Sequence, residues 1–153
     1  MTTIPSAYSR FGYTLALAER TLTAALREHL AERGTEPETW YALQLIAMRG
    51  PAVDRTTLSA ELMSSRTLNA DLTGKLLARI EADGLIRGDS KISLTAQGQA
   101  LYRSLSEYIA VPRVRLLSQF SLDDIDTTVR TLQAIAERAA EQVPAPGQGI
   151  TAS

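Results

Sequence analysis

The sequence predicts a mainly α-helical protein with a single short β-hairpin in the middle of the chain. Apolar residues recur at three- and four-residue steps along most of its length, which is the pattern of amphipathic helices. Only residues 85–94 differ, because there two short apolar runs flank a glycine turn, the pattern of a hairpin. We therefore expect a helical architecture with one small β element.

Composition excludes several classes of protein. The 153 residues are enough for one core, and 44 % hydrophobic with 22 % charged residues is typical of globular domains. The absence of cysteine excludes disulfides, thiolate catalysis and iron–sulfur clusters. The chain starts without a secretion-signal pattern and has no stretch near the roughly 20 apolar residues of a membrane span, so we expect a cytoplasmic protein.

A long first helix is predicted over residues 8–33, where the apolar periodicity is continuous up to a glycine. Thr35 and Glu38 then match the capping-box pattern Thr-x-x-Glu, in which each side chain satisfies a free backbone donor. This pattern predicts a second helix over about residues 36–48. The inner face of that helix carries Trp40, Leu43, Ile46 and Ala47.

Two short helices follow close together, as in a helix-turn-helix unit. The first covers about residues 55–64, and the second begins at Asn69, whose side chain can accept from the amides of the first turn. Gly84 is expected to end it, because glycine adopts the left-handed conformation that closes helices. The hairpin, with its turn at residues 88–90, follows at once. This order is that of a winged helix-turn-helix.

The C-terminal part predicts two more long helices. One begins at Thr95 and should be kinked or broken at Pro112, which cannot donate a backbone hydrogen bond. The last begins after Ser121, and residues 143–153 are expected to be a disordered tail. These helices and the first carry more apolar surface than a module of ~60 residues can cover, which favours a dimer over the alternative, a monomeric bundle.

Three stretches of the middle module also match a family pattern. They are Glu61-Leu62, residues 76–86, and Ser93-Leu94-Thr95-Ala96-Gln97-Gly98, of which the Leu-Thr-x-x-Gly step is the most specific. With these residues the chain resembles the MarR family of bacterial regulators from about Tyr8 to Glu141. The resemblance implies a homodimer joined by its terminal helices, one recognition helix per subunit in the DNA major groove, and a response to small aromatic effectors.

The predicted organisation follows from this resemblance. Residues 1–7 would be an N-terminal arm, residues 8–142 a single domain, and residues 143–153 the tail. Within the domain, residues 35–95 would form the winged helix-turn-helix, and residues 8–33 and 96–142 the dimerisation helices. A two-fold dimer would place its recognition helices roughly 34 Å apart, which predicts a pseudo-palindromic operator in double-stranded DNA.

Candidate DNA contacts lie on the winged module. We expect the start of the recognition helix to face the bases and the basic side chains to contact phosphates. Asn69, Thr73 and Lys75 are expected to face the groove. The contacts to the DNA backbone are expected from Arg55, Thr57, Arg66, Arg79, Arg87 and Lys91.

Two features of this surface depart from the family. The hairpin turn is too short for the extended wing whose arginine enters the minor groove. Asp71, in the first turn of the recognition helix, would favour the helix dipole or accept from cytosine, yet it would repel phosphate. Residues 49–91 contain seven basic and six acidic residues, a net charge of +1, so we expect weak and strongly salt-sensitive DNA binding. Arg79 could instead pair with acids on its own helix.

A tentative ligand site is predicted from aromatic residues and the sole histidine. Its members are Phe11, His29, Trp40, Tyr41 and Tyr102. Aromatic residues at helical spacing form cores more often than pockets, and a histidine on an apolar face is more often a core residue than a ligand contact. With one histidine and no nucleophile-elbow or phosphate-loop motif, we expect no metal, no cofactor and no enzyme.

The sequence thus predicts a dimeric, sequence-specific DNA-binding transcriptional regulator, a ligand-responsive repressor. The alternative keeps the dimer but drops DNA, so that the fold serves small-molecule binding, protein interaction or a cofactor-free reaction. A neutral or negative recognition face together with an open internal cavity would favour that alternative.

Overall fold

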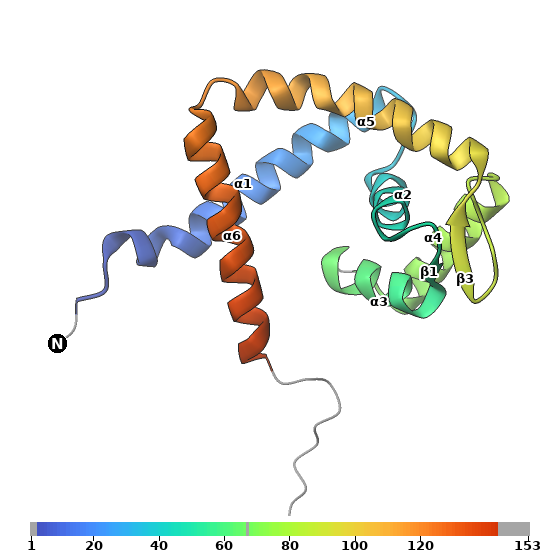
Figure 1. Cartoon of the computed structure of the whole chain (residues 1–153), viewed down its shortest axis with the longest axis horizontal. Coiled ribbons are helices and arrows are strands. Elements are labelled where there is room, and N and C mark those ends of the chain that lie inside the picture. The colour runs from blue at the N-terminus through green and yellow to red at the C-terminus, as the bar shows by residue number, and fades with distance from the viewer. Residues whose placement is uncertain (1–2, 67, 144–153) are drawn as a thin grey trace, which may run out of the picture. The chain divides into compact units, whose positions relative to one another are not determined.

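The computed structural model describes residues 3–66 and 68–143 of the chain, and its two compact units divide between Ala110 and Val111. These residues are mainly helical, with six helices and one three-stranded sheet, which confirms the predicted fold class. In order, the elements in Figure 1 are α1 (Ser6–Ala31), α2 (Pro37–Arg49), β1 (Val53–Asp54), α3 (Arg55–Arg66), α4 (Ala70–Ala82), β2 (Ile86–Arg87), β3 (Lys91–Leu94), α5 (Ala96–Leu117) and α6 (Leu122–Gln142).

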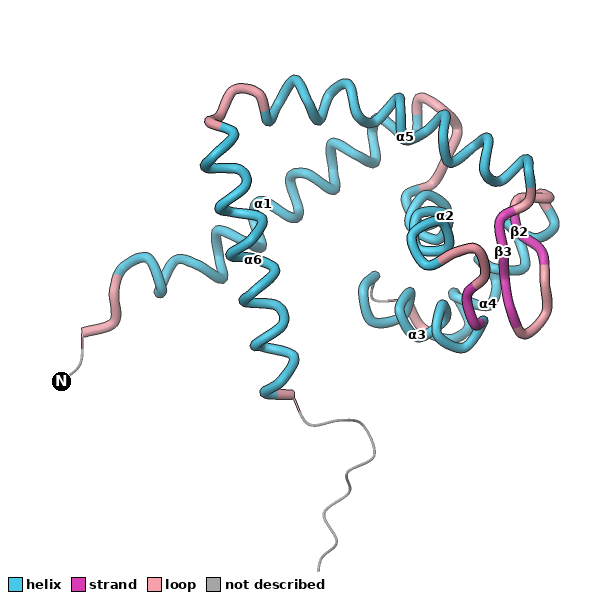
Figure 2. Tube along the Cα trace, viewed as in Figure 1, coloured by secondary structure: helices cyan, strands magenta, loops and turns pink. Residues whose placement is uncertain are grey.

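The main core of the first unit lies between α2, α3, α4 and the sheet (Figure 2). Each of these elements contributes apolar side chains at its own period. The core therefore packs the helix-turn-helix pair, α3 and α4, against α2 and the β2–β3 wing. The buried members are Ala42, Leu43, Ile46, Val53, Leu58, Leu62, Leu76, Leu77, Ile80, Leu85, Ile86, Ile92 and Leu94.

The sheet has the order β1-β3-β2, and both outer strands run antiparallel to β3. The predicted hairpin is therefore confirmed, but the expectation that it is the only strand signal is wrong. Val53 of β1 pairs with Ile92 of β3, and a two-residue strand is too short to show alternation in the sequence. The hairpin turn requires glycine at residue 88, where φ is +114° and a Cβ would lie 1.9 Å from the carbonyl oxygen of Lys91.

A second core in the same unit brings together the end of α1, α2 and α5. Leu30, Trp40, Leu105 and Ile109 are buried in it. The ring of Trp40 stacks on that of Tyr102, with centroids 5.4 Å apart and planes inclined by 16°. This stack fixes α2 against α5.

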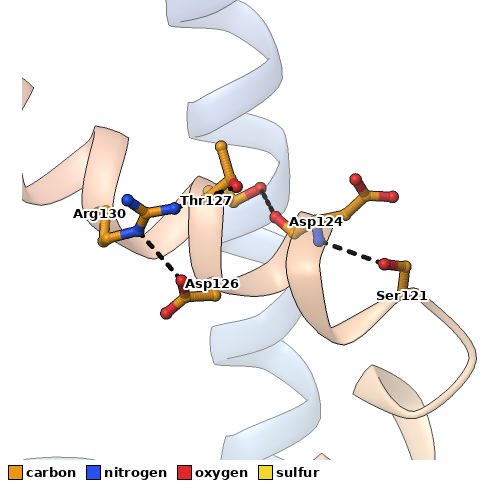
Figure 3. A network of polar contacts seen from close by, with 6 residues as sticks. Ser121, Asp124, Asp126, Thr127 and Arg130 are labelled. Carbon is orange, nitrogen blue, oxygen red and sulfur yellow. Dashed lines mark hydrogen bonds and ion pairs between the residues drawn. The ribbon is translucent and has the colours of Figure 1, made fainter.

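The predicted cap at Asn69 and the predicted helix start at Ser121 are confirmed. The side chain of Asn69 accepts a hydrogen bond of 2.8 Å from the backbone N–H of Leu72. In the second unit, Ser121 accepts from the backbone N–H of Asp124 at 3.4 Å, as Figure 3 shows at the start of α6. Both side chains satisfy a donor that the first helical turn leaves free.

The predicted capping box at Thr35 and Glu38 is wrong. α2 begins at Pro37, no side chain caps it, and the Thr35 hydroxyl donates to the carbonyl of Arg33 at 3.5 Å. Proline at the first helical position has no N–H to satisfy, and its fixed φ suits a helix start. The helix therefore starts at its proline without the box.

The Leu-Thr-x-x-Gly step joins the start of α5 to the end of α4. The Thr95 hydroxyl donates to the carbonyl of Gly84 at 2.5 Å and accepts from the N–H of Gly98 at 3.0 Å. A Cβ on Gly98 would lie only 2.0 Å from the carbonyl oxygen of Leu85, so only glycine permits this approach. The motif thus holds the start of α5 in close contact with the segment that follows α4.

α5 continues through Pro112 to Leu117, so of the two predicted effects of this proline, a kink or a break, the break does not occur. Pro112 cannot donate to the carbonyl one turn earlier, but the loss of a single backbone bond does not end the helix here. The helix therefore spans the boundary at which the chain divides into its two units.

The first and last helices of the chain carry apolar side chains that remain exposed. α1 begins at Ser6, two residues before the predicted start, and all residues from 3 to 22 are exposed, including Phe11 and Leu15. α6 buries none of its residues, and Val129 and Ile135 are among its exposed ones. Residues 1–2 of the predicted arm and residues 144–153 of the predicted tail lie outside the described residues, whereas the last two residues of the predicted arm belong to α1. No described helix is both long and apolar enough to cross a membrane.

Replacing Thr73 and Thr95 by valine should change stability in opposite directions. Thr73 is 2 % exposed and its hydroxyl has no hydrogen-bond partner among the described residues, so Thr73→Val should raise the free energy of unfolding by about 1 kcal/mol. Thr95→Val removes a cap and a bond to Gly84, so it should lower that energy by about 1–2 kcal/mol. Urea unfolding of both variants measures these free energies. A loss of stability in Thr73→Val would contradict the conclusion that the Thr73 hydroxyl is buried without a hydrogen bond.

Candidate nucleic-acid interface

α4 has one face in the core and the opposite face exposed. Thr73, Leu76, Leu77 and Ile80 are its buried residues. At about 100° per residue, Asp71 and Lys75 lie on the opposite side, and both are exposed. Gly74, Ala78 and Ala82 on the same side carry no polar side-chain atoms, and Arg79 lies at the edge of this face with its side chain 48 % exposed. The outward face of α4, the second helix of the pair, therefore carries mostly small side chains around the charged Asp71 and Lys75, and it is open to a partner.

The expectation that Thr73 faces a DNA groove is wrong. Its side chain lies on the buried face of α4 with Leu76 and Leu77 and is almost inaccessible to solvent. The helical period would have placed it there, because residues 73, 76, 77 and 80 follow the spacing of one helix face. Thr73 was expected at the groove because its side chain is polar, although its spacing indicated burial.

Asp71 and Lys75 form an ion pair one turn apart on the outward face. The Lys75 Nζ lies 3.1 Å from Asp71 Oδ2, and each side chain is 72 % exposed. Asn69 precedes them as the cap of the helix, also exposed. The side chains at the start of α4 are thus accessible, but their charges cancel.

Most other basic side chains of the winged module also contact a carboxylate. The Nη2 atom of Arg79 lies 2.8 Å from Oε2 of Glu36, the residue that precedes α2. The sequence had suggested a partner on Arg79's own helix instead. Three further pairs among the described residues join Lys91 to Asp54 at 3.7 Å, Arg49 to Glu61 at 2.5 Å and Arg55 to Glu81 at 3.9 Å. These exposed pairs each contribute only about 0–1 kcal/mol, so another anion could replace the carboxylate at little cost.

Arg55 holds the turn of the wing. Its Nε donates to the carbonyl of Asp89 at 2.7 Å and its Nη2 to the carbonyl of Gly88 at 3.2 Å. Its backbone N–H also donates to the carbonyl of Ser90 at 2.9 Å. Three hydrogen bonds therefore tie the start of α3 to the wing, and the guanidinium is a structural group as well as a surface charge.

The remaining predicted contacts differ in their surroundings. Arg87 is exposed on β2, and no carboxylate of residues 3–66 and 68–143 pairs with it. Thr57 is exposed in the first turn of α3. Arg66 ends α3, but its side chain lies outside the described part of the structure. Arg87 is thus the described basic group of this face that is most available to a phosphate.

The predicted ligand residues do not form one site. Trp40 is 3 % exposed and belongs to the second core, so it is packed rather than open to a ligand. Tyr41 packs partly against that core, and Phe11 is exposed near the N-terminal end of α1. Tyr102, which stacks on Trp40, also lines a surface pocket of about 480 Å³ between α2 and α5. Polar side chains from Gln99, Arg103, Ser106 and Glu107 line the same pocket.

His29 belongs to a cluster at the end of α1. Its ring lies edge-on to that of Tyr108, with centroids 6.5 Å apart, while the guanidinium of Arg33 lies 4.1 Å above the Tyr108 ring. The Tyr108 hydroxyl donates to Glu32, and this hydrogen bond raises the pKa of the tyrosine above its ordinary value. The cluster fastens α1 to α5, and the described residues contain no group of three metal-ligand side chains.

No family model matches the chain, and no curated protein matches it. Solved structures do. The chain is similar to a MarR family protein of Mycobacterium tuberculosis in complex with DNA, at 20 % identity and a TM-score of 0.65 over 81 % of this chain and 95 % of that one. Staphylococcus aureus MarR in complex with salicylate and kanamycin has 17 % identity and a TM-score of 0.74, over 91 % and 96 % of the two chains.

A MarR family protein of Bacillus stearothermophilus is similar as well, with 21 % identity and a TM-score of 0.72 over 91 % of this chain and 99 % of that one. These structures share the order of helices and the wing along nearly the whole of their own chains. The chain described here therefore has the MarR-type winged-helix fold.

Replacing Arg55 by alanine should loosen the wing without unfolding the protein. The variant loses two hydrogen bonds to the carbonyls of residues 88 and 89, so amide exchange in β3 should become about ten-fold faster. Hydrogen exchange followed by mass spectrometry measures this. Arg87→Ala is the matched control, because the Arg87 guanidinium makes no hydrogen bond to the turn of the wing in the described part of the chain. Equal exchange rates in the two variants would contradict the role of Arg55.

Proposed function

We propose that this chain, which has the fold of MarR family proteins, is a dimeric, sequence-specific DNA-binding regulator of transcription that acts as a ligand-responsive repressor. The observation that carries the proposal is the outward face of α4, which is exposed and follows α3 as the second helix of the pair. A helix presented in this way fits the major groove, and the wing beside it reaches the DNA backbone. The proposal assigns no catalytic residue and no cofactor, and it implies action in the cytoplasm.

The DNA contacts would come from two sets of side chains. Asn69 and Lys75 would meet the base edges of the DNA. The phosphates would be contacted by Arg87 and by other side chains of the winged module, some of which would leave the carboxylates that they now contact. The predicted members of this second set are Arg55, Thr57, Arg66, Arg79 and Lys91. Since exposed ion pairs are weak, the exchange of a carboxylate for a phosphate requires little free energy.

A second copy of the chain would cover the exposed apolar faces of the terminal helices. Soluble monomers rarely expose contiguous apolar surfaces of this kind, and both α1 and α6 carry exposed large apolar side chains at helical spacing. A two-fold pair would present two copies of α4 to one pseudo-palindromic site. Dimerisation is therefore part of the proposed DNA-binding mechanism.

The effector proposed here is a small aromatic compound. One of the similar proteins was solved with salicylate, which supports this class of ligand. In this chain Tyr102 lines the pocket between α2 and α5 and also stacks on Trp40. A ligand bound in that pocket could therefore shift Tyr102 and, through it, the packing of Trp40 in the second core. Binding that favoured one arrangement of the two recognition helices would change the affinity for the operator.

One observation favours the alternative without DNA, namely the near-neutral surface of the winged module. Ion pairs cancel most of its basic charge, as a protein-binding or small-molecule-binding derivative of the fold would require. Against it, that alternative expected an open internal cavity, whereas the Trp40 and Tyr102 rings stack on each other and Trp40 is buried in the second core. We therefore place DNA binding first.

The protein should bind duplex DNA from the region upstream of its own gene, and raising the salt concentration should weaken this binding steeply. Each phosphate neutralised contributes about 0.9 to the slope of log affinity against log salt, and we expect a slope of about −3 to −5 from this sparsely basic face. Fluorescence anisotropy at several salt concentrations measures it. Absence of binding even at low salt would refute the proposed function, and Arg87→Ala should reduce the slope by about one unit.

The solution mass should equal twice that of the 16.6 kDa chain. Val129→Glu places a charge on the exposed apolar face of α6 and should shift the protein toward monomers in light scattering after size-exclusion chromatography. Ala134→Glu is the matched control, since residue 134 lies on the opposite side of the helix. A wild-type mass of one chain, or equal effects of the two variants, would contradict the proposed dimer.

A further inference from the structure

We infer that Asp71 is a specificity-determining residue of α4, which weakens binding to non-cognate DNA and is compensated only where a cytosine faces it. The inference rests on the proposed DNA-binding function and concerns which sequence the helix prefers. It follows from the position of Asp71, from its pairing with Lys75, and from the hydrogen bonds that a carboxylate can make.

The position of Asp71 is fixed by the core. Burial of Leu76, Leu77 and Ile80 orients α4, and Asp71 and Lys75 project from the other side. Their ion pair, 3.1 Å long, is highly exposed, so nothing in the described structure shields it from a partner. Between and after them, Gly74 and Ala78 offer no polar atom. Any DNA that meets this face meets these two side chains together.

The pair lowers the affinity for DNA of arbitrary sequence. A carboxylate on the contact face repels phosphates. Lys75 is already paired with this carboxylate, so the pair neutralises little phosphate charge and releases few counterions from the DNA. Non-specific binding depends almost entirely on such phosphate contacts. The loss falls equally on all sequences.

A cytosine–guanine base pair compensates for this loss. An ionised carboxylate only accepts hydrogen bonds, and in the major groove the cytosine N4 amino group donates one. Guanine beside it presents the two acceptors O6 and N7, which suit the lysine ammonium. Asp71 and Lys75 therefore match the two halves of one such base pair, or of two adjacent ones. A site without that donor leaves the carboxylate facing acceptors.

A second ion pair in the chain provides a matched control. Asp126 and Arg130 on α6 also lie one turn apart, with an N···O distance of 3.0 Å and similar exposure (Figure 3). Asp71→Asn and Asp126→Asn each remove one exposed carboxylate from such a pair and raise the net charge equally. Only the first changes the outward face of α4.

The experiment compares the wild-type protein, Asp71→Asn and Asp126→Asn, all full length. Binding sites are first selected from a randomised duplex library, and dissociation constants for the selected and a scrambled duplex are then measured by anisotropy at several salt concentrations. Asp71→Asn should bind scrambled DNA about three- to ten-fold more tightly, with a salt slope steeper by about 0.9. Its preference for the selected cytosine should fall or shift to adenine, because asparagine pairs with adenine N6 and N7. Asp126→Asn should behave as the wild type.

Each contrary result has one meaning. If the wild type selects a sequence and Asp71→Asn selects the same one with the same affinity for scrambled DNA, Asp71 has no such role, although the proposed function stands. If both variants tighten scrambled binding equally, the effect is one of net charge and the inference is wrong. If the wild type binds no duplex, the proposed function fails and the inference with it. Circular dichroism melting of both variants verifies that they are folded.

Discussion

The burial of one face of α4 is the constraint on which the rest of the molecule depends. Leucine and isoleucine side chains that leave water contribute about 1.5–3 kcal/mol each, whereas an exposed ion pair contributes about 0–1 kcal/mol. The orientation of α4 is therefore set by Leu76, Leu77 and Ile80 in the core, and its surface charges have no part in it. A rigid helix with an adaptable surface results, as recognition of a partner requires.

The sequence predicted well those elements that depend on local chemistry. Helix periods, the Asn69 cap and the hairpin are encoded within a few residues, so the sequence is enough to infer them. The capping box was misassigned because Pro37 determines the same helix start by a different means. β1 exists only through its pairing with β3, and a strand of two residues has no period of its own.

The charged surface was harder to predict, because its pairs are distant in the sequence. Arg79 and Glu36 are 43 positions apart, and Arg55 reaches a carbonyl 34 positions away. Composition alone gave the right total charge but not its local cancellation. The burial of Thr73, by contrast, could have been predicted from the sequence, because its helical spacing with Leu76, Leu77 and Ile80 indicated it. Similarity at about one-fifth identity establishes the fold and leaves this surface to be determined residue by residue.

The hydrogen bonds of Arg55 to the wing have a consequence for evolution. They end on main-chain carbonyls, which every amino acid provides, so the anchoring of the turn is independent of the side chain at residue 89. Only Gly88 is restricted, by its positive φ. The tip can therefore accumulate substitutions, and acquire or lose a charge, while its shape is inherited unchanged.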